Sequence, residues 1–551
     1  MPPVPAFTRR RELFVLLGCL ALFLALAAVR AWDHTHPYYD DVGFLDLGNQ
    51  VRELGGPLGL IKALYAGSWL EDNRNPLYLA VLSLVAGRDR GYHTRARVLT
   101  VGLGALALLA CWWVARRHAG RRPALVLAGF LAASETLIEY SGRESAEPLL
   151  VLLWALSLGA ILDGLRRPRA WLVAGFLAGL AQLDKGSGIF LVFCLGLALL
   201  LHRGPRALGD PYAWGSGALF VVAASPLLVR NLRAYGSPLH HWNNRLVWID
   251  RLPDYAEIYA PRAFARLPHG FNQWWQQTSW HELWFGRGVM GVAETAVHLG
   301  DAMSLVAPSP LGPFHIPGVV IGFVLLLVAL RLLWRAERSF ARTFLLVQAA
   351  FFVAFFFTFS VAGGSSRYVF PMTVTLVAVL AREAVARPVW LRRWAALAAL
   401  SVAVAVVFDP FPRKLRPGFD AAQTWLAQAL HPGEAYAVDS RSQLEPEWFL
   451  PAANRMEIVS STWARKALQP EELLPAFRAR GVRYVLLDAW SHKDADPRYF
   501  FFDHLPLAAD GSLPLAALPE GLTTAWRSPE GRFAILSVST AAAAPAAAPA
   551  R

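Results

Sequence analysis

The sequence predicts an all-α polytopic membrane protein with about eleven transmembrane helices, followed by a small α/β domain outside the membrane. Of its 551 residues, 55% are hydrophobic and 17% are charged, and the mean hydropathy is +0.36. Soluble domains have about 25% charged residues. Long apolar runs recur over the first 410 residues, and basic residues gather in the loops between them. These features exclude a soluble enzyme, a disordered chain and a secreted disulfide scaffold.

The net charge of +13 does not indicate a nucleic-acid-binding protein, because of where it lies. From residue 409 onward there are 15 basic and 16 acidic residues, so the basic excess is confined to the apolar part of the chain. Basic residues in short loops between apolar runs are the signature of membrane insertion. The three cysteines (Cys19, Cys111 and Cys194) all lie within apolar runs, so we expect no disulfide framework.

Eleven apolar runs predict the membrane helices, with boundaries uncertain by a few residues. They are residues 13–29, 96–115, 123–139, 148–163, 170–183, 187–201, 213–229, 316–334, 343–362, 368–386 and 393–408. If the N-terminus is cytoplasmic, the inside loops hold 20 basic residues and five acidic ones. Joining 170–183 to 187–201 as one helix would invert every later loop, so we predict two.

The remaining segments complete the predicted domain organisation. The membrane domain spans residues 1–408 and includes two outer segments, 30–95 and 230–315, of which the short apolar run 77–87 predicts a helix on the membrane surface. Residues 409–540 form the α/β domain, and the Ala/Pro-rich residues 541–551 form a disordered tail. The expected elements of the α/β domain are a helix at Ala421–Leu430, a strand at Ala435–Asp439, a helix at Pro470–Arg480 and a strand at Arg483–Asp488.

Two groups of carboxylates are expected at the outer membrane surface. Asp40 and Asp41 directly follow the first apolar run and open an amphipathic stretch. A carboxylate there can accept a proton or hold a cation, although capping of the helix explains the same pattern. Glu144 and Glu147 precede the fourth span. Ionisable groups so close to the hydrocarbon are energetically costly, so a functional role is the first interpretation.

Several cations are expected at the same membrane surface, against the charge rule that the other loops follow. Arginine forms bidentate bonds to phosphate, so such cations suit a lipid phosphate, although snorkelling or pairing with nearby acids explains them equally well. They are Arg143, Lys185, Arg230 and Arg367, the last followed by Tyr368. No nucleotide-binding loop or zinc-ligand spacing is present in the sequence, and the pair His240–His241 lacks a third ligand nearby.

The order of these motifs resembles a known family. The acidic pair after the first span, Asn75-Pro76-Leu77-Tyr78, and Arg97 opening the second helix are similar to the integral-membrane glycosyltransferases of the GT-C fold. The nearest likeness is to glycosyltransferase family 39, the bacterial relatives of protein O-mannosyltransferases and of the lipid A aminoarabinose transferase. The stretch from Gly179 to Gly186, the stretch Pro226–Asn231 with Gly236-Ser237-Pro238, and Arg367-Tyr368 carry the later part of the resemblance.

The resemblance implies a sugar transferase that uses a polyprenyl-phosphate-linked donor. Asp40 matches the family's catalytic base, with Asp41 as its helper or as a cation ligand, and Tyr78 matches the aromatic residue of the family's Pro-Pro-Leu-Tyr motif. Two departures are Asp40-Asp41 in place of Asp-Glu, and Asn75 in place of the first proline. The resemblance also implies a bacterial inner-membrane location, with the N-terminus cytoplasmic and the C-terminal domain periplasmic or extracellular.

The implied reaction is an inverting displacement at the anomeric carbon, transferring a hexose or pentose to a hydroxyl of a lipid, glycan or protein acceptor. Arg367, Lys185 and Arg230 would bind the leaving phosphate. The sequence indicates no particular cofactor, and the need for a divalent cation, Mg²⁺ or Mn²⁺, is left open. The alternative is a transporter or flippase of lipid-linked saccharides, which predicts charges at the bilayer midplane and an internal repeat. A purely structural scaffold would explain neither the outer acids nor the outer cations.

Overall fold

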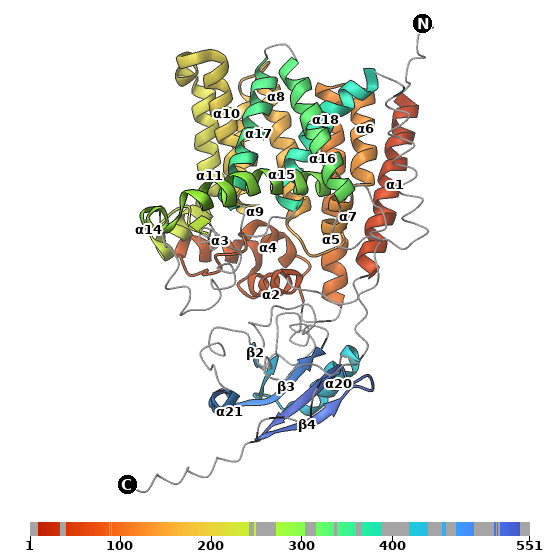
Figure 1. The fold of residues 1–551 in the computed structure, drawn as a ribbon, viewed down its shortest axis with the longest axis vertical. Coiled ribbons are helices and arrows are strands. Elements are labelled where there is room, and N and C mark those ends of the chain that lie inside the picture. Colours follow the sequence, from red (N-terminus) through yellow and green to blue (C-terminus); the bar gives the residue numbers. More distant parts are fainter. Residues whose placement is uncertain are drawn as a thin grey trace.

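The computed structural model is a bundle of long helices with a small β-sheet domain at one end (Figure 1). The residues that it describes are 9–33, 40–87, 89, 91–241, 247–248, 271–303, 316–335, 339–359, 366–386, 389, 418–438, 455–458, 470–489, 512–513, 515, 518 and 520–539.

Within those residues, five helices are long and apolar enough to cross a membrane: Arg9–Trp32, Gly91–His118, Glu147–Gly164, Gly188–Gly209 and Pro211–Tyr235. Shorter apolar helices follow the same direction at Ala170–Asp184, Phe340–Phe352 and Val369–Arg382. The multi-pass membrane class is therefore confirmed, while the count of eleven stays a prediction. The predicted span 393–408 lies outside the described residues.

The bundle is built from helices α1 to α18, of which the last three follow residues 230–315. The first group is α1 (Arg9–Asp33), α5 (Gly91–His118), α6 (Arg121–Ala132), α7 (Glu135–Ser141), α8 (Glu147–Gly164), α9 (Ala170–Asp184), α10 (Gly188–Arg203), the 3-10 helix η1 (Gly204–Gly209) and α11 (Pro211–Tyr235). The second group is α16 (Ile316–Arg335), α17 (Phe340–Phe359) and α18 (Ser366–Ala386). As predicted, α9 and α10 are separate helices.

One predicted span is divided in two. Residues 123–139 were expected to form one helix, but α6 ends at Ala132 and α7 begins at Glu135. Ser134 stands at the N-cap of α7, where its hydroxyl accepts a hydrogen bond from the Leu137 amide. Serine competes with helical backbone bonding through such local bonds, which explains why the apolar pattern continues while the helix does not.

Glycines allow α9 and α11 to pack closely. Gly175 and Gly179 lie one turn apart on α9, and a Cβ on either would collide with α11, at the Ser216 backbone and at the Phe220 carbonyl respectively. Small residues four positions apart permit such close approach of membrane helices. At its cap, α11 is held by Asp210, whose carboxylate accepts hydrogen bonds from the amides of Tyr212 and Ala213.

Short helices cover one end of the bundle, which we call the α2–α4 face. They are α2 (Asp40–Glu53), α3 (Gly56–Ala66) and α4 (Pro76–Ser83). Further along the chain are α14 (Phe271–Gln277), the π-helix η3 (Glu282–Val289) and α15 (Met290–Ala302), and α15 packs on α16, α17 and α18. The predicted surface helix at 77–87 is thus present as α4. Leu47, Val51, Leu60 and Leu79 form a small core that joins α2, α3 and α4.

At the opposite face, the arginines of the loops pair with nearby acids. Nε of Arg116 lies 2.5 Å from Oε1 of Glu12 on α1, and Nε of Arg117 lies 2.6 Å from Oδ1 of Asp163 on α8. The first contact connects the end of α5 to the beginning of α1, and the second connects the end of α5 to the end of α8.

The C-terminal domain contains a five-stranded sheet of order β2-β1-β3-β5-β4. The strands are β1 (Ala435–Val438), β2 (Arg455–Ile458), β3 (Val482–Asp488), β4 (Leu522–Arg527) and β5 (Phe533–Val538), and the helices are α20 (Phe419–Ala429) and α21 (Pro470–Ala479). Strand β1 pairs in parallel with β2 and β3, whereas β5 is antiparallel to β3 and β4. All four elements that the sequence predicts here are present, and β2, β4 and β5 are additional.

Candidate active site

The first part of the candidate site joins α2 to the loop between α7 and α8. Asp41, in the first turn of α2, is 1% exposed, and its Oδ1 accepts a hydrogen bond of 3.2 Å from Nε of Arg143. Arg143 also lies 3.3 Å from Glu139 of α7. Burial alone would lower the pKa of Arg143, but the two carboxylates outweigh it and raise the pKa above its ordinary value. The guanidinium therefore stays charged and holds α2 against this loop.

Glu144 lies behind that pair, with no exposed surface. Its Oε1 is 2.6 Å from Nδ1 of His93 and 3.4 Å from Nε of Arg97, both on α5. Burial raises the pKa of Glu144, but the electrostatic interactions with His93 and Arg97 and the hydrogen bond from His93 prevail and hold the pKa below its ordinary range. Glu144 thus acts as a buried anchor between the loop and α5. The sequence contained no local signal for His93, because it is 51 positions away.

Tyr78 of α4 fixes the same loop by a chain of hydrogen bonds. The Ser145 amide donates to the Tyr78 hydroxyl at 3.0 Å, and this hydroxyl lies 2.7 Å from Oγ1 of Thr100 on α5. Thr100 itself donates to the Ala96 carbonyl, so the Tyr78 hydroxyl is the donor to Thr100. Complete burial raises the pKa of Tyr78. The tyrosine is therefore a neutral structural link between α4, α5 and the loop.

The second part of the candidate site is centred on Glu147, the first residue of α8. Its carboxylate, 6% exposed, accepts hydrogen bonds from the Lys185 ammonium, which follows α9, and from the Ser145 hydroxyl. A guanidinium nitrogen of Arg367, in the first turn of α18, lies 3.8 Å from Oε1. Lys185 and Arg367 keep 24% and 29% of their side chains exposed. One carboxylate thus holds two accessible cations from different helices.

Arg230 has a different environment. It is 2% exposed, and its guanidinium donates to the Glu71 carbonyl and lies over the ring of Tyr235. The next residue, Asn231, donates to the carbonyls of Pro238 and His240. Arg230 therefore binds the loop that precedes α4, and Asn231 binds the loop that follows α11. Both side chains fix loops on the α2–α4 face.

His240 and His241 are also located on this face. Nε2 of His240 lies 3.0 Å from Oδ2 of Asp72, and its ring stacks on Tyr235. Burial lowers the pKa of His241 to about 4, which keeps its ring neutral. Among the described residues, no group of three or more His, Cys, Asp or Glu side chains is arranged to hold a metal ion.

The structure thus brings most of the sequence-predicted residues to one face of the bundle. Asp41 and Arg143 form one assembly, and Glu147, Lys185 and Arg367 form another. Ser145 connects them through its contacts to Tyr78 and Glu147. Asp40 begins α2, and Tyr368 lies in α18, but the side chains of both are outside the described part of the chain.

Comparisons with known proteins agree with this architecture. Residues 76–229 match the family model of dolichyl-phosphate-mannose-protein mannosyltransferases. This region extends from α4 into α11 and includes Glu144, Glu147 and Lys185. No curated protein matches the chain.

Among solved structures, the chain is similar to the crystal structure of the Archaeoglobus fulgidus oligosaccharyltransferase complex with Zn and sulfate. The TM-score is 0.53 at 15% identity, over 95% of this chain and 73% of that chain. ArnT from Cupriavidus metallidurans bound to undecaprenyl phosphate gives a TM-score of 0.45 at 15% identity, over 95% of this chain and 97% of that one. The similarity to the oligosaccharyltransferase structure shows the GT-C fold, and the family-model match over residues 76–229 agrees with the resemblance that the motifs indicated.

Proposed function

We propose that this protein is an integral-membrane glycosyltransferase that moves a sugar from a polyprenyl-phosphate-linked donor to an acceptor hydroxyl at the α2–α4 face. The family match supports the glycosyltransferase class, since that family is described as acting with a polyprenyl-phosphate sugar. The acceptor is a lipid, a glycan or a protein. We further propose that this face is the outer side of a bacterial inner membrane, with the N-terminus cytoplasmic and the C-terminal domain outside.

The observation that carries this proposal is the pair of cations around Glu147. Lys185 and Arg367 come from α9 and α18, and both combine an ionic contact to Glu147 with exposed surface. A phosphate at the membrane surface needs cations of this kind, and arginine offers it two parallel N–H donors. Glu147 keeps the two cations together before the phosphate arrives, so their mutual repulsion does not need to be overcome on binding.

The reaction follows from the chemistry of a phosphate leaving group. The acceptor oxygen attacks the anomeric carbon, and the bond from this carbon to the phosphate oxygen breaks, with its electron pair going to polyprenyl phosphate. Attack from the opposite side inverts the anomeric configuration. Because phosphate leaves readily, stabilisation of its charge by Lys185 and Arg367 replaces a general acid.

The proton of the acceptor hydroxyl goes to Asp40 in this proposal. Asp41 is unsuited to that task because it is buried and bound by Arg143. We assign Asp41 the role of holding the start of α2, the helix in which Asp40 is the first residue. The proposed steps use no Mg²⁺ or Mn²⁺.

The test is transfer by the purified protein in liposomes from a defined, radiolabelled polyprenyl-phosphate sugar to candidate acceptors. A transferase releases polyprenyl phosphate in step with glycosylated acceptor. A flippase, the alternative, would move the labelled lipid across the bilayer without breaking its sugar–phosphate bond. Arg367→Ala should abolish most of the transfer, whereas Lys62→Ala, an exposed cation on α3, should leave it unchanged.

Orientation is tested separately by reporter fusions. A reporter after Arg551 should be active only outside the cytoplasm, and one at Arg121 only inside. Reversal of either result would exclude an outer active site.

A further inference from the structure

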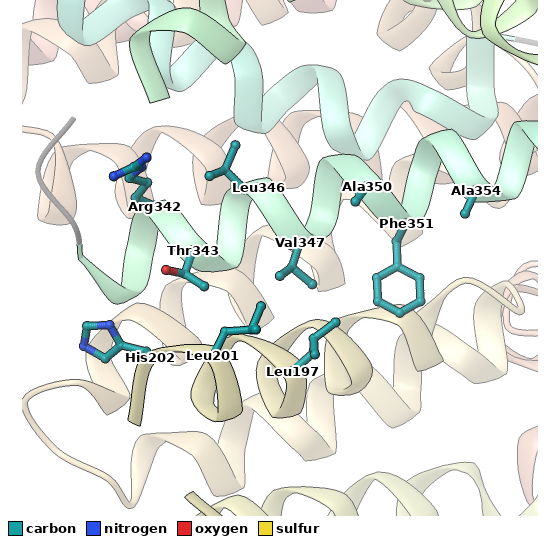
Figure 2. A pocket seen from close by; sticks show the side chains of 10 residues that line it. All are labelled: Leu197, Leu201, His202, Arg342, Thr343, Leu346, Val347, Ala350, Phe351 and Ala354. Atoms are coloured by element: carbon teal, nitrogen blue, oxygen red, sulfur yellow. The ribbon is translucent and has the colours of Figure 1, made fainter. Parts of the chain in front are cut away.

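A cavity that contains none of the candidate active-site residues lies at the opposite end of the helix bundle. It has a volume of about 900 Å³ and runs between α10 and α17. Leu197, Leu201 and His202 of α10 face residues of α17, and His202 and Arg342 lie together at one end (Figure 2). We propose that this groove binds an anionic phospholipid of the leaflet at that face, with its headgroup phosphate on Arg342 and His202.

The shape of the groove fits one leaflet. Its α17 wall is formed at intervals of three or four residues, which places the wall on one side of the helix. These wall residues are Thr343, Leu346, Val347, Ala350, Phe351 and Ala354. From Thr343 to Ala354, at 1.5 Å per residue, the wall extends about 16 Å along the axis. Half of a hydrocarbon core of about 30 Å is about 15 Å. An acyl chain entering at the headgroup level therefore reaches the end of the groove near the bilayer centre.

Aromatic contacts join α10 and α17 at two places along the groove. At the inner end, the Phe351 ring lies 5.8 Å from Phe190 and 6.4 Å from Phe193, between ring centroids, which seals α17 against α10. At the headgroup end, the His202 ring lies 6.0 Å from Phe340. Between these contacts, Leu197 and Leu201 are 40% and 63% exposed, so the apolar wall is open to the lipid phase.

Charge complementarity selects an anionic headgroup. Arg342 and His202 are the ionisable residues of the groove lining, and no acidic side chain is among the lining residues that the structure describes. The Arg342 guanidinium lies 5.5 Å from the centre of the Trp334 ring, which is 71% exposed, as for an aromatic residue of the membrane interface. Basic pockets between membrane helices are a recognised mode of binding phospholipid headgroups.

The test measures lipid retained by the purified full-length protein. Wild type and variants are reconstituted in discs of phosphatidylcholine with or without phosphatidylglycerol, re-extracted in detergent, and analysed for bound lipid by mass spectrometry. Wild type should retain phosphatidylglycerol preferentially. Arg342→Ala with His202→Ala should retain about fivefold less phosphatidylglycerol, as expected for the removal of one arginine near an anionic lipid. Leu346→Trp, which fills the groove, should reduce the retention of both lipids.

Two variants serve as controls. Arg166→Ala removes an exposed arginine from the same membrane face but outside the groove, and it should retain lipid as wild type does. Arg342→Lys keeps the charge and should retain phosphatidylglycerol, which separates loss of the cation from loss of folding. Equal retention by wild type and the double variant, or polyprenyl phosphate as the retained lipid, would overturn the proposal. Disulfide cross-linking of a cysteine at Leu346 to one within residues 393–408 would also overturn it.

Discussion

The Glu144 carboxylate and the His93 imidazole form a contact of 2.6 Å between two membrane-surface elements that are 51 positions apart. Arg97 approaches the same carboxylate from one turn further along α5. Because Glu144 is fully buried, its charge is stabilised by these partners and by a backbone hydrogen bond instead of by water. A buried carboxylate is costly without such partners, so this contact determines whether the loop between α7 and α8 can stay packed on α5.

We predict that Glu144→Gln destabilises the protein by about 3–5 kcal/mol at neutral pH, because it leaves the charge of Arg97 without its buried counterion. The pH dependence should change as well. The pKa of Glu144 is lowered by folding, so the unfolded state takes up its proton first as pH falls. Wild type should therefore lose stability below about pH 4.5, and the variant should lose less. Thermal unfolding in detergent measures this, with exposed Glu53→Gln as control. Identical acid curves would contradict the prediction.

A second pH effect comes from His241, with a different window. Burial lowers its pKa to about 4, from an ordinary value of 6.5. Between these values the unfolded state binds a proton that the folded state does not, so stability falls as pH drops from 6.5 to about 4. The full effect is at most about 3 kcal/mol. His241→Gln should flatten the stability curve in this window and leave the window below pH 4 to Glu144. An unchanged slope in the variant would show that His241 titrates normally.

Arg367 should affect donor use far more than folding. It keeps 29% of its side chain exposed, and its ionic contact to Glu147 is long at 3.8 Å, so it contributes little to stability. A hydrogen bond to a charged phosphate contributes about 1.5–3 kcal/mol, so Arg367→Ala should reduce kcat/KM for the donor by about 10- to 150-fold. Arg367→Lys should recover part of the loss, since it keeps charge without the planar fork. Equal turnover by wild type and Arg367→Ala would remove this residue from the site.

The prediction with the greatest risk concerns Asp40. As the general base it should contribute about 10²–10⁴ in rate, so Asp40→Asn should cost about 3–5 kcal/mol of transition-state stabilisation. Asparagine also caps helices well, so a residue that only begins α2 would tolerate this change. The measurement is transfer from a defined polyprenyl-phosphate sugar by variants matched for folded protein.

Asp41→Asn is the matched control for Asp40. It removes the charge that Arg143 binds, so it should lower the melting temperature and reduce the rate less than Asp40→Asn. If Asp40→Asn turns over within a few-fold of wild type, capping is its role and Glu147 becomes the next candidate.

Local sequence patterns predicted most of the helices and strands. They did not predict which residues distant in sequence pair with one another. The start of α2 at Asp40, the separation of α9 from α10, and strands β1 and β3 are all local consequences of charge, glycine or apolar periodicity. The hairpin of β4 and β5 also had a local signal, the turn residues Ser528-Pro529-Glu530-Gly531, which we did not use. By contrast, the break after Ala132 depends on a single serine hydroxyl.

For the candidate site, residue types at the membrane surface were predictable, but their partners were not. Lys185 lies beside Asp184 in sequence, yet its ammonium bonds to Glu147. Arg230 was expected to bind phosphate, and that role stays a prediction, but its guanidinium is engaged by the Glu71 carbonyl. Such choices depend on how helices distant in sequence pack, and periodicity within one helix contains no information about them.

The arrangement around Glu147 also sets an order of assembly. The three charged residues of this arrangement are Glu147, Lys185 and Arg367. They leave the ribosome at separate times, since roughly 180 residues lie between Lys185 and Arg367. At a synthesis rate of about 5–20 residues per second, this interval is roughly 10–40 s. During it, the nascent chain holds a matched pair of one anion and one cation, without net charge. Only insertion of α18 adds the surplus positive charge, so attraction for a phosphate arises after helices α1 to α17 have been synthesised.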